Sequence, residues 1–397
     1  MRAYNEEWIY NREILGQTAR WHRQGLVSDK QMDTARKVYP VEFRQTNSFI
    51  EIGLFLFTTV AILACYLLPA SVFSSQLDNQ TTYGLFNVAF GIGVGVIGRV
   101  LIKQRLLYRN GIDNAFVITL TGFLAFGLNQ FLPNGLSLAT HCLAMLPLLL
   151  LILWYYGDTL IAFFCLATFY TFIFDTLLKV SWGKDALPFV MMGVSLVMYI
   201  LVKQVVNRNT RQVYYTDPLN LVQWISLIVL AASGNYYVVR ELNALLLPHT
   251  STSAIGIKGS PKIVLSGLFW LLTFAIPVIY LWQGLAKKNR MLIILGALGI
   301  MAAFVTIHEY VTLLPLNVAL TSAGLTLIGI AVLGIRYLSR PKYDFTDSPD
   351  DDSPNELFVN IASIAAVQAT STIPHAPKDN LRFGDGDFGG AGSEGKY

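Results

Sequence analysis

Charged side chains are scarce in this sequence. Asp, Glu, Lys and Arg make up 14% of its 397 residues, whereas hydrophobic residues make up 54%. A soluble globular domain carries about 25% charged residues. The shortage of charge therefore argues against a set of soluble domains and favours a chain that lies largely in lipid.

Signatures of catalysis are also missing. The chain has no HExxH, G-x-S-x-G or G-x-x-x-x-G-K-[ST] sequence. The string GDGDFG at 384–389 fits the phosphate-binding pattern G-x-G-x-x-G and contains the kinase triplet DFG. A phosphate loop follows a strand and begins a helix, and neither is indicated here. The sequence favours a non-enzymatic protein without a cofactor.

Cysteine is rare. Cys65, Cys142 and Cys165 are the only three. Each lies inside an apolar run, and none has a partner at the spacing of metal ligands. We therefore expect packed, unpaired thiols, without a disulfide or a metal site.

Long apolar runs fill most of the chain. Crossing a bilayer as a helix takes about 20 apolar residues, and a backbone in lipid must satisfy its hydrogen bonds internally. The sequence therefore predicts an all-α, polytopic transmembrane bundle at 49–338 with about ten helices. Their predicted spans are 49–68, 83–102, 112–132, 137–156, 159–178, 187–206, 219–239, 263–282, 291–310 and 314–338.

Basic residues predict the orientation of these helices. With the N-terminus in the cytoplasm, 21 of the Lys and Arg residues up to position 342 lie on the cytoplasmic side and 5 on the other. This bias fits the positive-inside rule only for an even number of helices. We expect both ends to be cytoplasmic, and residues 1–48 lack the apolar core of a signal peptide. The net charge of +4 then reflects topology rather than nucleic-acid binding.

Residues 1–45 are predicted to form a cytoplasmic helical hairpin. Gly25 ends the first helix, and Ser28 with Gln31 forms a capping box for the second. One interpretation is an amphipathic pair that rests on the membrane surface. The other is a docking site for a protein, in which Trp21 and Gly25 belong to the recognised segment.

The hairpin sequence RWHRQGLVSDKQMDTARKV resembles a bacterial membrane family, the domain of unknown function 2157. In that family Trp-x-x-x-Gly, two aliphatic residues, Ser and a nearby Gln precede a many-helix membrane region. The resemblance covers about the first 70 residues in detail. It implies a multi-pass protein of a bacterial inner membrane and brings no activity with it.

Residues 339–397 are predicted to form a flexible tail, first acidic and then rich in glycine. Its end, FGDGDFGGAGSEGKY, resembles the FGGG-type tails of other bacterial envelope membrane proteins. Phe383 and Phe388 are candidate contacts for a partner. A solvated glycine-rich end without a partner is the alternative interpretation.

An internal repeat is suggested by two segments. GVGVIGRVLIKQ at 93–104 and GVSLVMYILVKQ at 193–204 align without a gap. The fourth and eighth spans share an internal proline, an LW pair and a glycine. A parallel four-helix repeat occurs in some transporters. The alternative is convergence: helices that end in the cytoplasm tend to have basic ends, and this would produce the same similarity without a repeat.

Ionisable residues within apolar spans are functional candidates, because charge is costly in lipid. All of them lie near predicted span ends, and no carboxylate lies at mid-bilayer. Asp175 and Lys179 are spaced to pair along one helix. The candidates form an outer cluster of His141, Asp175, His308 and Glu309, beside Asn129 and Asn317, and an inner cluster of Glu51, Arg99 and Asp113, with Asp158 near the same boundary.

Three functions are consistent with these features. The first is an integral membrane protein that acts with protein partners through its cytoplasmic hairpin and tail. The second is a transporter or flippase, suggested by the number of helices and the repeat. The third is a membrane-embedded enzyme of the envelope that uses the outer cluster.

Overall fold

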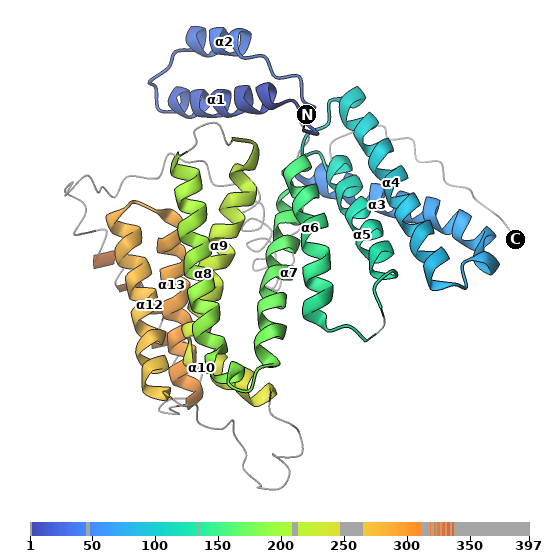
Figure 1. Ribbon diagram of the computed structural model, residues 1–397. Helices are drawn as coiled ribbons and strands as arrows, with labels where there is room; N and C mark the ends of the chain where they lie inside the picture. The colour runs from blue at the N-terminus through green and yellow to red at the C-terminus, as the bar shows by residue number, and fades with distance from the viewer. Residues whose placement is uncertain are drawn as a thin grey trace, which may run out of the picture. The chain divides into compact units, whose positions relative to one another are not determined.

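A computed structural model describes residues 2–44, 48–133, 135–208, 213–246 and 265–310, with scattered positions between 318 and 336. Every regular element in these ranges is helical, as the sequence predicts (Figure 1). The helices are α1 (Glu6–Arg23), α2 (Asp29–Val38), α3 (Ser48–Val72), α4 (Gln80–Arg105), α5 (Ile112–Asn129), α6 (Leu138–Tyr156), α7 (Thr159–Leu178), α8 (Gly183–Arg208), α9 (Thr216–Gly234), α10 (Tyr236–Leu245), α12 (Ser266–Ala286) and α13 (Arg290–Tyr310), with 3-10 turns η1 (Ser74–Gln76) and η2 (Val213–Tyr215).

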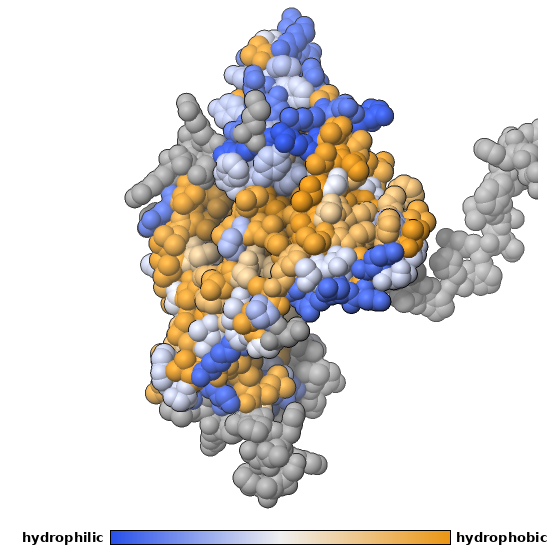
Figure 2. Space-filling model, turned by 45° about the vertical axis from the view of Figure 1, so that its right-hand side comes forward, coloured by the Kyte–Doolittle hydropathy of each residue, from blue (hydrophilic) through white to orange (hydrophobic). Residues whose placement is uncertain are grey.

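Eight of the described helices are long and apolar enough to cross a membrane, and the bent pair α9–α10 makes a ninth. These nine match the first nine predicted spans. The predicted tenth span, 314–338, lies outside the continuously described ranges. Hydrophobic side chains cover much of the visible face of the helices, while hydrophilic ones gather over α1 and α2 (Figure 2). The fold is that of a multi-pass membrane protein.

The prediction of a continuous helix over 219–239 is wrong. The chain bends by 78° where α9 ends and α10 begins. Asn235 has an extended backbone there, and its Oδ1 accepts hydrogen bonds from the N–H groups of Tyr237 (2.9 Å) and Val238 (3.2 Å). A side chain that caps a new helix offers the backbone an alternative to continuing the old one. Consequently α10 runs beyond the predicted span, into the connection between the spans 219–239 and 263–282.

The predicted caps of the hairpin are confirmed. Gly25 has a φ of +73°, and its N–H donates to the carbonyl of His22. The N–H of Leu26 donates to the carbonyl of Trp21, which completes a Schellman motif at the end of α1. Ser28 and Gln31 form the capping box that begins α2.

The helices pack against one another in an order that occurs twice. In the first half, α3 and α4 pack against α5, and α5 contacts α6. In the second half, α7 and α8 pack against α9, and α9 contacts α12. Each fourth helix then pairs with the next helix, α6 with α7 and α12 with α13. The offset of four helices is the one suggested by the sequence similarity.

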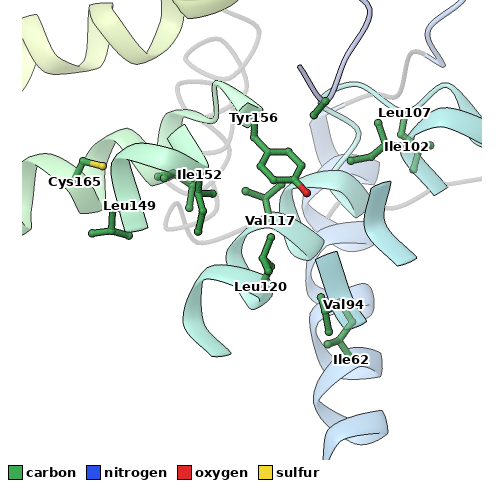
Figure 3. Packing of buried hydrophobic residues seen from close by; sticks show 12 residues of the cluster. Ile62, Val94, Ile102, Leu107, Val117, Leu120, Leu149, Ile152, Tyr156 and Cys165 are labelled. Atoms are coloured by element: carbon green, nitrogen blue, oxygen red, sulfur yellow. The ribbon is translucent and has the colours of Figure 1, made fainter. Parts of the chain in front are cut away.

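The largest buried cluster joins α3 to α7. Figure 3 shows Ile62 of α3 beside Val94 of α4, with side chains of α5 and α6 filling the space between neighbouring helices. Burying an apolar side chain stabilises its position by about 1.5–3 kcal/mol in water. In lipid that gain is absent, so close packing matters more.

Glycines of α4 provide such close packing. A Cβ atom at Gly91, Gly95 or Gly98 would lie 2.9–3.1 Å from the side chain of a residue of α5. Gly93, in the same helix, has nothing within 4 Å of its Cβ position.

Candidate functional site

The outer candidates lie on different helices. Asp175 of α7 accepts a hydrogen bond from the N–H of Ala139 in the first turn of α6 (2.7 Å), and it also pairs with Lys179. His141 contacts the carbonyl of Ser137 through Nδ1 (2.9 Å). The predicted Asp175–Lys179 pair is confirmed. These contacts hold the beginning of α6 against the end of α7.

His308 and Glu309 lie in the last turn of α13, which packs against α12 and α9. Among the described residues, no hydrogen bond or ion pair joins either of them to His141 or Asp175. Asn129 is exposed at the end of α5, and Asn317, Phe383 and Phe388 lie outside the described residues. The structure therefore does not bring the outer candidates into one site.

The inner candidates lead to a more connected site at the end of the bundle that carries the hairpin. Asp113, the second residue of α5, is completely buried. Its carboxylate accepts hydrogen bonds from the N–H groups of Arg109 (2.7 Å) and Asn110 (3.1 Å) and from the hydroxyl of Tyr4 (3.0 Å). A buried carboxylate requires such donors. The side chain of Asp113 thus joins the N-terminal segment to the loop that precedes α5.

Arg109 links the two halves of the bundle. Its guanidinium pairs with Asp217, which is the second residue of α9 as Asp113 is of α5. Its backbone has a φ of +51°, a conformation that costs a residue with a side chain free energy. The hydrogen bond of its N–H to Asp113 helps to hold that conformation.

Of the other two inner candidates, Glu51 lies beside Asp113 and Arg99 does not. Glu51 is in the first turn of α3, and its carbonyl faces Gly111, where a Cβ atom would lie 2.0 Å away. Arg99 is exposed, with its guanidinium 5.9 Å from the ring centroid of Tyr155. Glu51 therefore belongs to the junction around Asp113. The basic residue of this inner cluster is Arg109, whereas the sequence analysis had selected Arg99.

The first residues of the chain cap the end of α6. The N–H of Ala3 donates to the carbonyl of Tyr155 (3.1 Å). The hydroxyl of Tyr214 donates to the same carbonyl (2.8 Å), and that of Tyr215 donates to the carbonyl of Trp154 (2.6 Å). The last carbonyls of a helix have no partner within it. Distant segments provide the partners here.

Aromatic contacts fix the hairpin to the bundle. The ring of Phe43 stacks on Tyr108 with centroids 4.7 Å apart, and Trp8 meets Phe43 edge-on at 5.3 Å. Tyr4 meets Tyr108 edge-on at 5.1 Å. Each such pair contributes about 0.5–1.5 kcal/mol beyond its buried area. The base of α1 is therefore a part of the packed structure rather than a free appendage.

A cavity of about 230 Å³ lies within this junction. Its wall combines tyrosine rings with polar and charged side chains of α3, α5 and the turn between α6 and α7. They include Tyr4, Glu51, Tyr108, Arg109, Asn114, Tyr156, Asp158 and Tyr214. We name it the junction cavity.

Burial shifts the pKa of several groups that line the cavity, Tyr4 and Asp158 among them. Burial, and then the negative charge of Asp113, raises the pKa of Tyr4 well above its ordinary value, so Tyr4 remains a hydrogen-bond donor. Burial also raises the pKa of Asp158, although hydrogen bonds from the N–H groups of Ile161 and Leu160 oppose the shift. Asp158 is thus an acidic group held in partly dehydrated surroundings.

Sequence reasoning missed Tyr4, Tyr214 and the ion pair of Arg109. It counted Arg109 only as a basic residue of a loop. The available signal was the aspartate at the second position of both α5 and α9, because both carboxylates meet Arg109.

Comparison with known proteins gives no further guide: no family model, curated protein or solved structure matches the chain.

Proposed function

We propose that this multi-pass membrane protein is non-enzymatic and acts by docking a protein partner on the tip of its α1–α2 hairpin. In this proposal the protein lies in a bacterial inner membrane, with both chain ends on the cytoplasmic side. The observation that supports docking is an apolar surface at the tip that the fold leaves uncovered. Trp21 is 50% exposed and Leu26 is 70% exposed. The Schellman motif around Gly25 holds these two side chains at one turn.

The attachment of the hairpin gives this surface a mechanical consequence. Tyr4 and Trp8 at the beginning of the chain pack into the bundle. A force on the tip is therefore transmitted to α5 and to the end of α6, because packed contacts rather than a flexible linker join the hairpin to the bundle. A partner bound at Trp21 and Leu26 would be held in a fixed place relative to the membrane helices.

The test places a photo-crosslinking amino acid at Trp21 or at Leu26 of the full chain in native membranes. We expect a protein adduct of one defined mass from both positions. The matched control is Glu13, which is exposed on α1 away from the tip and should give none. Leu26→Ser should lower the yield from position 21 by about tenfold, corresponding to about 1.4 kcal/mol.

Deletion of residues 1–45 is an unsuitable test, because it would also remove Tyr4 from Asp113 and Phe43 from Tyr108. Adducts to lipid alone would support the alternative, a hairpin that rests on the membrane. Equal adducts from position 13 would contradict a specific site at the tip.

Sidedness has its own test. Single cysteines are placed at Gln17 and at Ser75 in a background without Cys65, Cys142 and Cys165. In intact cells the two should differ in their reaction with an impermeant thiol reagent. Only position 75, in η1 between α3 and α4, should react with an impermeant thiol reagent. Reaction at position 17 would place the hairpin outside and overturn the proposed orientation.

A transporter or flippase is a second candidate, favoured by a specific observation. The packing order repeats with an offset of four helices, and the second half contains the broken pair α9–α10. Parallel repeats and discontinuous helices occur in transporters. Uptake or lipid scrambling by vesicles containing the purified protein would test it, with empty vesicles as the control.

A further inference from the structure

The wall of the junction cavity is rich in aromatic rings. Tyr4, Tyr108, Tyr156 and Tyr214 all line it, and they come from four separate segments of the chain. Aromatic faces carry partial negative charge and attract cations, and organic ammonium groups most characteristically. Arg12 and Arg109 already lie over the ring of Tyr108, each with its guanidinium carbon 5.3 Å from the centroid. Arg2 lies over the ring of Tyr214 in the same way, at 4.9 Å, so two of the four rings already contact cations of the chain itself.

The charges around the cavity do not balance. Asp113 accepts hydrogen bonds from Tyr4, Arg109 and Asn110. Asp217 is paired with Arg109. Glu51 lines the cavity and, within the described ranges, has no side-chain hydrogen bond or ion pair. Asp158 uses one carboxylate oxygen, Oδ1, for the N–H groups of Leu160 and Ile161. The guanidinium groups of Arg109 and Arg12 act on Glu51 from a distance, and that of Arg109 acts on Asp158, but neither carboxylate forms an ion pair within the described ranges. Two guanidinium groups against four carboxylates leave an excess of negative charge around the cavity.

The donor set argues against a metal ion. Among the described residues, no group of three or more His, Cys, Asp and Glu side chains is arranged to hold one. Metal ions such as Ca²⁺ require about six to eight oxygen ligands at short distances. Rings beside two carboxylates suit a larger cation with an apolar surface and dispersed charge.

We propose that the junction cavity binds a small organic ammonium ion, with the tyrosine rings around its apolar surface and the carboxylates of Glu51 and Asp158 facing its charge. A volume of about 230 Å³ is below the range of about 300–1,000 Å³ that is typical of sites for drug-sized ligands. The ligand is therefore of the size of an alkylammonium ion or of choline. This site stands independently of docking at the hairpin tip.

Titration calorimetry on the purified full-length protein in detergent tests the proposal. Choline and tetramethylammonium are the probes, and 3,3-dimethyl-1-butanol, which has the shape of choline without its charge, is the control ligand. We expect both cations to bind at least tenfold more tightly than the neutral alcohol. Equal binding of the alcohol, or no binding of either cation, would overturn the proposal.

Variants of the two carboxylates test where the cation lies. Glu51→Gln and Asp158→Asn should each weaken choline binding by about tenfold, because each removes one charge and little volume. Asparagine caps a helix as well as aspartate does, so Asp158→Asn keeps the start of α7. Glu13→Gln removes a charge from the exposed face of α1 and should leave the affinity unchanged. Unchanged binding in both cavity variants, with the helix content preserved, would overturn the assignment.

The ammonium group has two possible sources, and lipid composition separates them. In nanodiscs, a free cation should bind equally well whether the lipid is phosphatidylglycerol alone or includes phosphatidylethanolamine. If the ligand is a lipid headgroup, phosphatidylethanolamine should compete and weaken choline binding severalfold. If phosphatidylethanolamine weakens choline binding by the same factor in the Glu51→Gln variant, the competition occurs outside this cavity. That result would contradict a headgroup in this cavity.

Discussion

The two halves of the membrane bundle share one packing order but differ at the junction. Asp113, at the start of the third helix of the first half, is completely buried and accepts three hydrogen bonds. Asp217, at the start of the third helix of the second half, has a side chain that is 43% exposed and pairs with Arg109. The arrangement of helices thus tolerates very different surroundings for equivalent residues. The candidate site arises where the halves differ.

The second helix of each half makes different contacts. In the first half, α4 packs closely against α5, the third helix, through Gly91, Gly95 and Gly98. In the alignment of 93–104 with 193–204, the residue of α8 that corresponds to Gly95 is Ser195, which is buried and lies 2.9 Å from the hydroxyl of Tyr170. At this position the second helix approaches the third helix closely in the first half, whereas in the second half it makes a polar contact to the first helix, α7.

The largest expected effect concerns the two aspartates. Asp113→Ala would leave buried donors of Tyr4, Arg109 and Asn110 without an acceptor, at about 1–3 kcal/mol each. We expect a loss of at least about 3 kcal/mol in the free energy of unfolding, measured by SDS titration in mixed micelles. Asp217→Ala removes a partly exposed ion pair and should cost about 0–1 kcal/mol. Equal losses would contradict the contrast between the halves.

The glycine contact of α4 gives the next largest effect. Gly98→Ala places a Cβ atom 2.9 Å from that of Phe116 and should destabilise the protein by about 1–3 kcal/mol. Gly93→Ala is a control in the same helix, because its Cβ position is open. That variant should be neutral or slightly stabilising, since alanine favours helices. The same unfolding assay compares the two.

The bend between α9 and α10 distinguishes the second half and depends on Asn235. Asn235→Ala removes the acceptor for Tyr237 and Val238 and for the hydroxyl of Thr306 (3.2 Å). We expect a loss of about 0.5–2 kcal/mol. Asn235→Ser retains a capping oxygen and should recover part of it. A variant with alanine that is as stable as the original would show that packing alone produces the bend.

The smallest effect concerns a feature that the halves share. Tyr66 donates to Asn87 across α3 and α4 (3.1 Å), and Tyr170 meets Ser195 across α7 and α8 (2.9 Å). Tyr66→Phe and Tyr170→Phe should each cost about 0.6 kcal/mol, the average for a hydrogen bond between membrane helices. A difference of more than about 1 kcal/mol would weaken the equivalence of these pairs.

Local signals predicted most of the fold. The nine described spans follow from apolar length, and the caps at Gly25 and Ser28 follow from residue type within one turn. The bend at Asn235 was not predicted, because the prediction followed the apolar length of 219–239 and gave no weight to Ser233, Gly234 and Asn235. The capping oxygen of Asn235 also accepts a hydrogen bond from Thr306, which lies 71 positions away.

The candidate site was predicted only in part. Glu51 and Asp113 were selected because ionisable residues in apolar spans are costly, and both lie at the junction cavity or directly behind it. The outer candidates were selected on the same ground, but α6 and α7 are not close neighbours of α13. Depth along a span is readable from sequence, whereas the neighbours around a helix are not.

The sequence by itself determined which segments are helical, how long they are and how the hairpin turns, because these properties depend on residues within a few positions of one another. Only the tertiary structure decided that Tyr4 meets Asp113 across 109 positions and that Arg109 reaches Asp217. In lipid, apolar surface does not choose between helix neighbours, so close packing and a few buried polar contacts make that choice. These contacts exist only after the helices have assembled, and the junction cavity exists only with them.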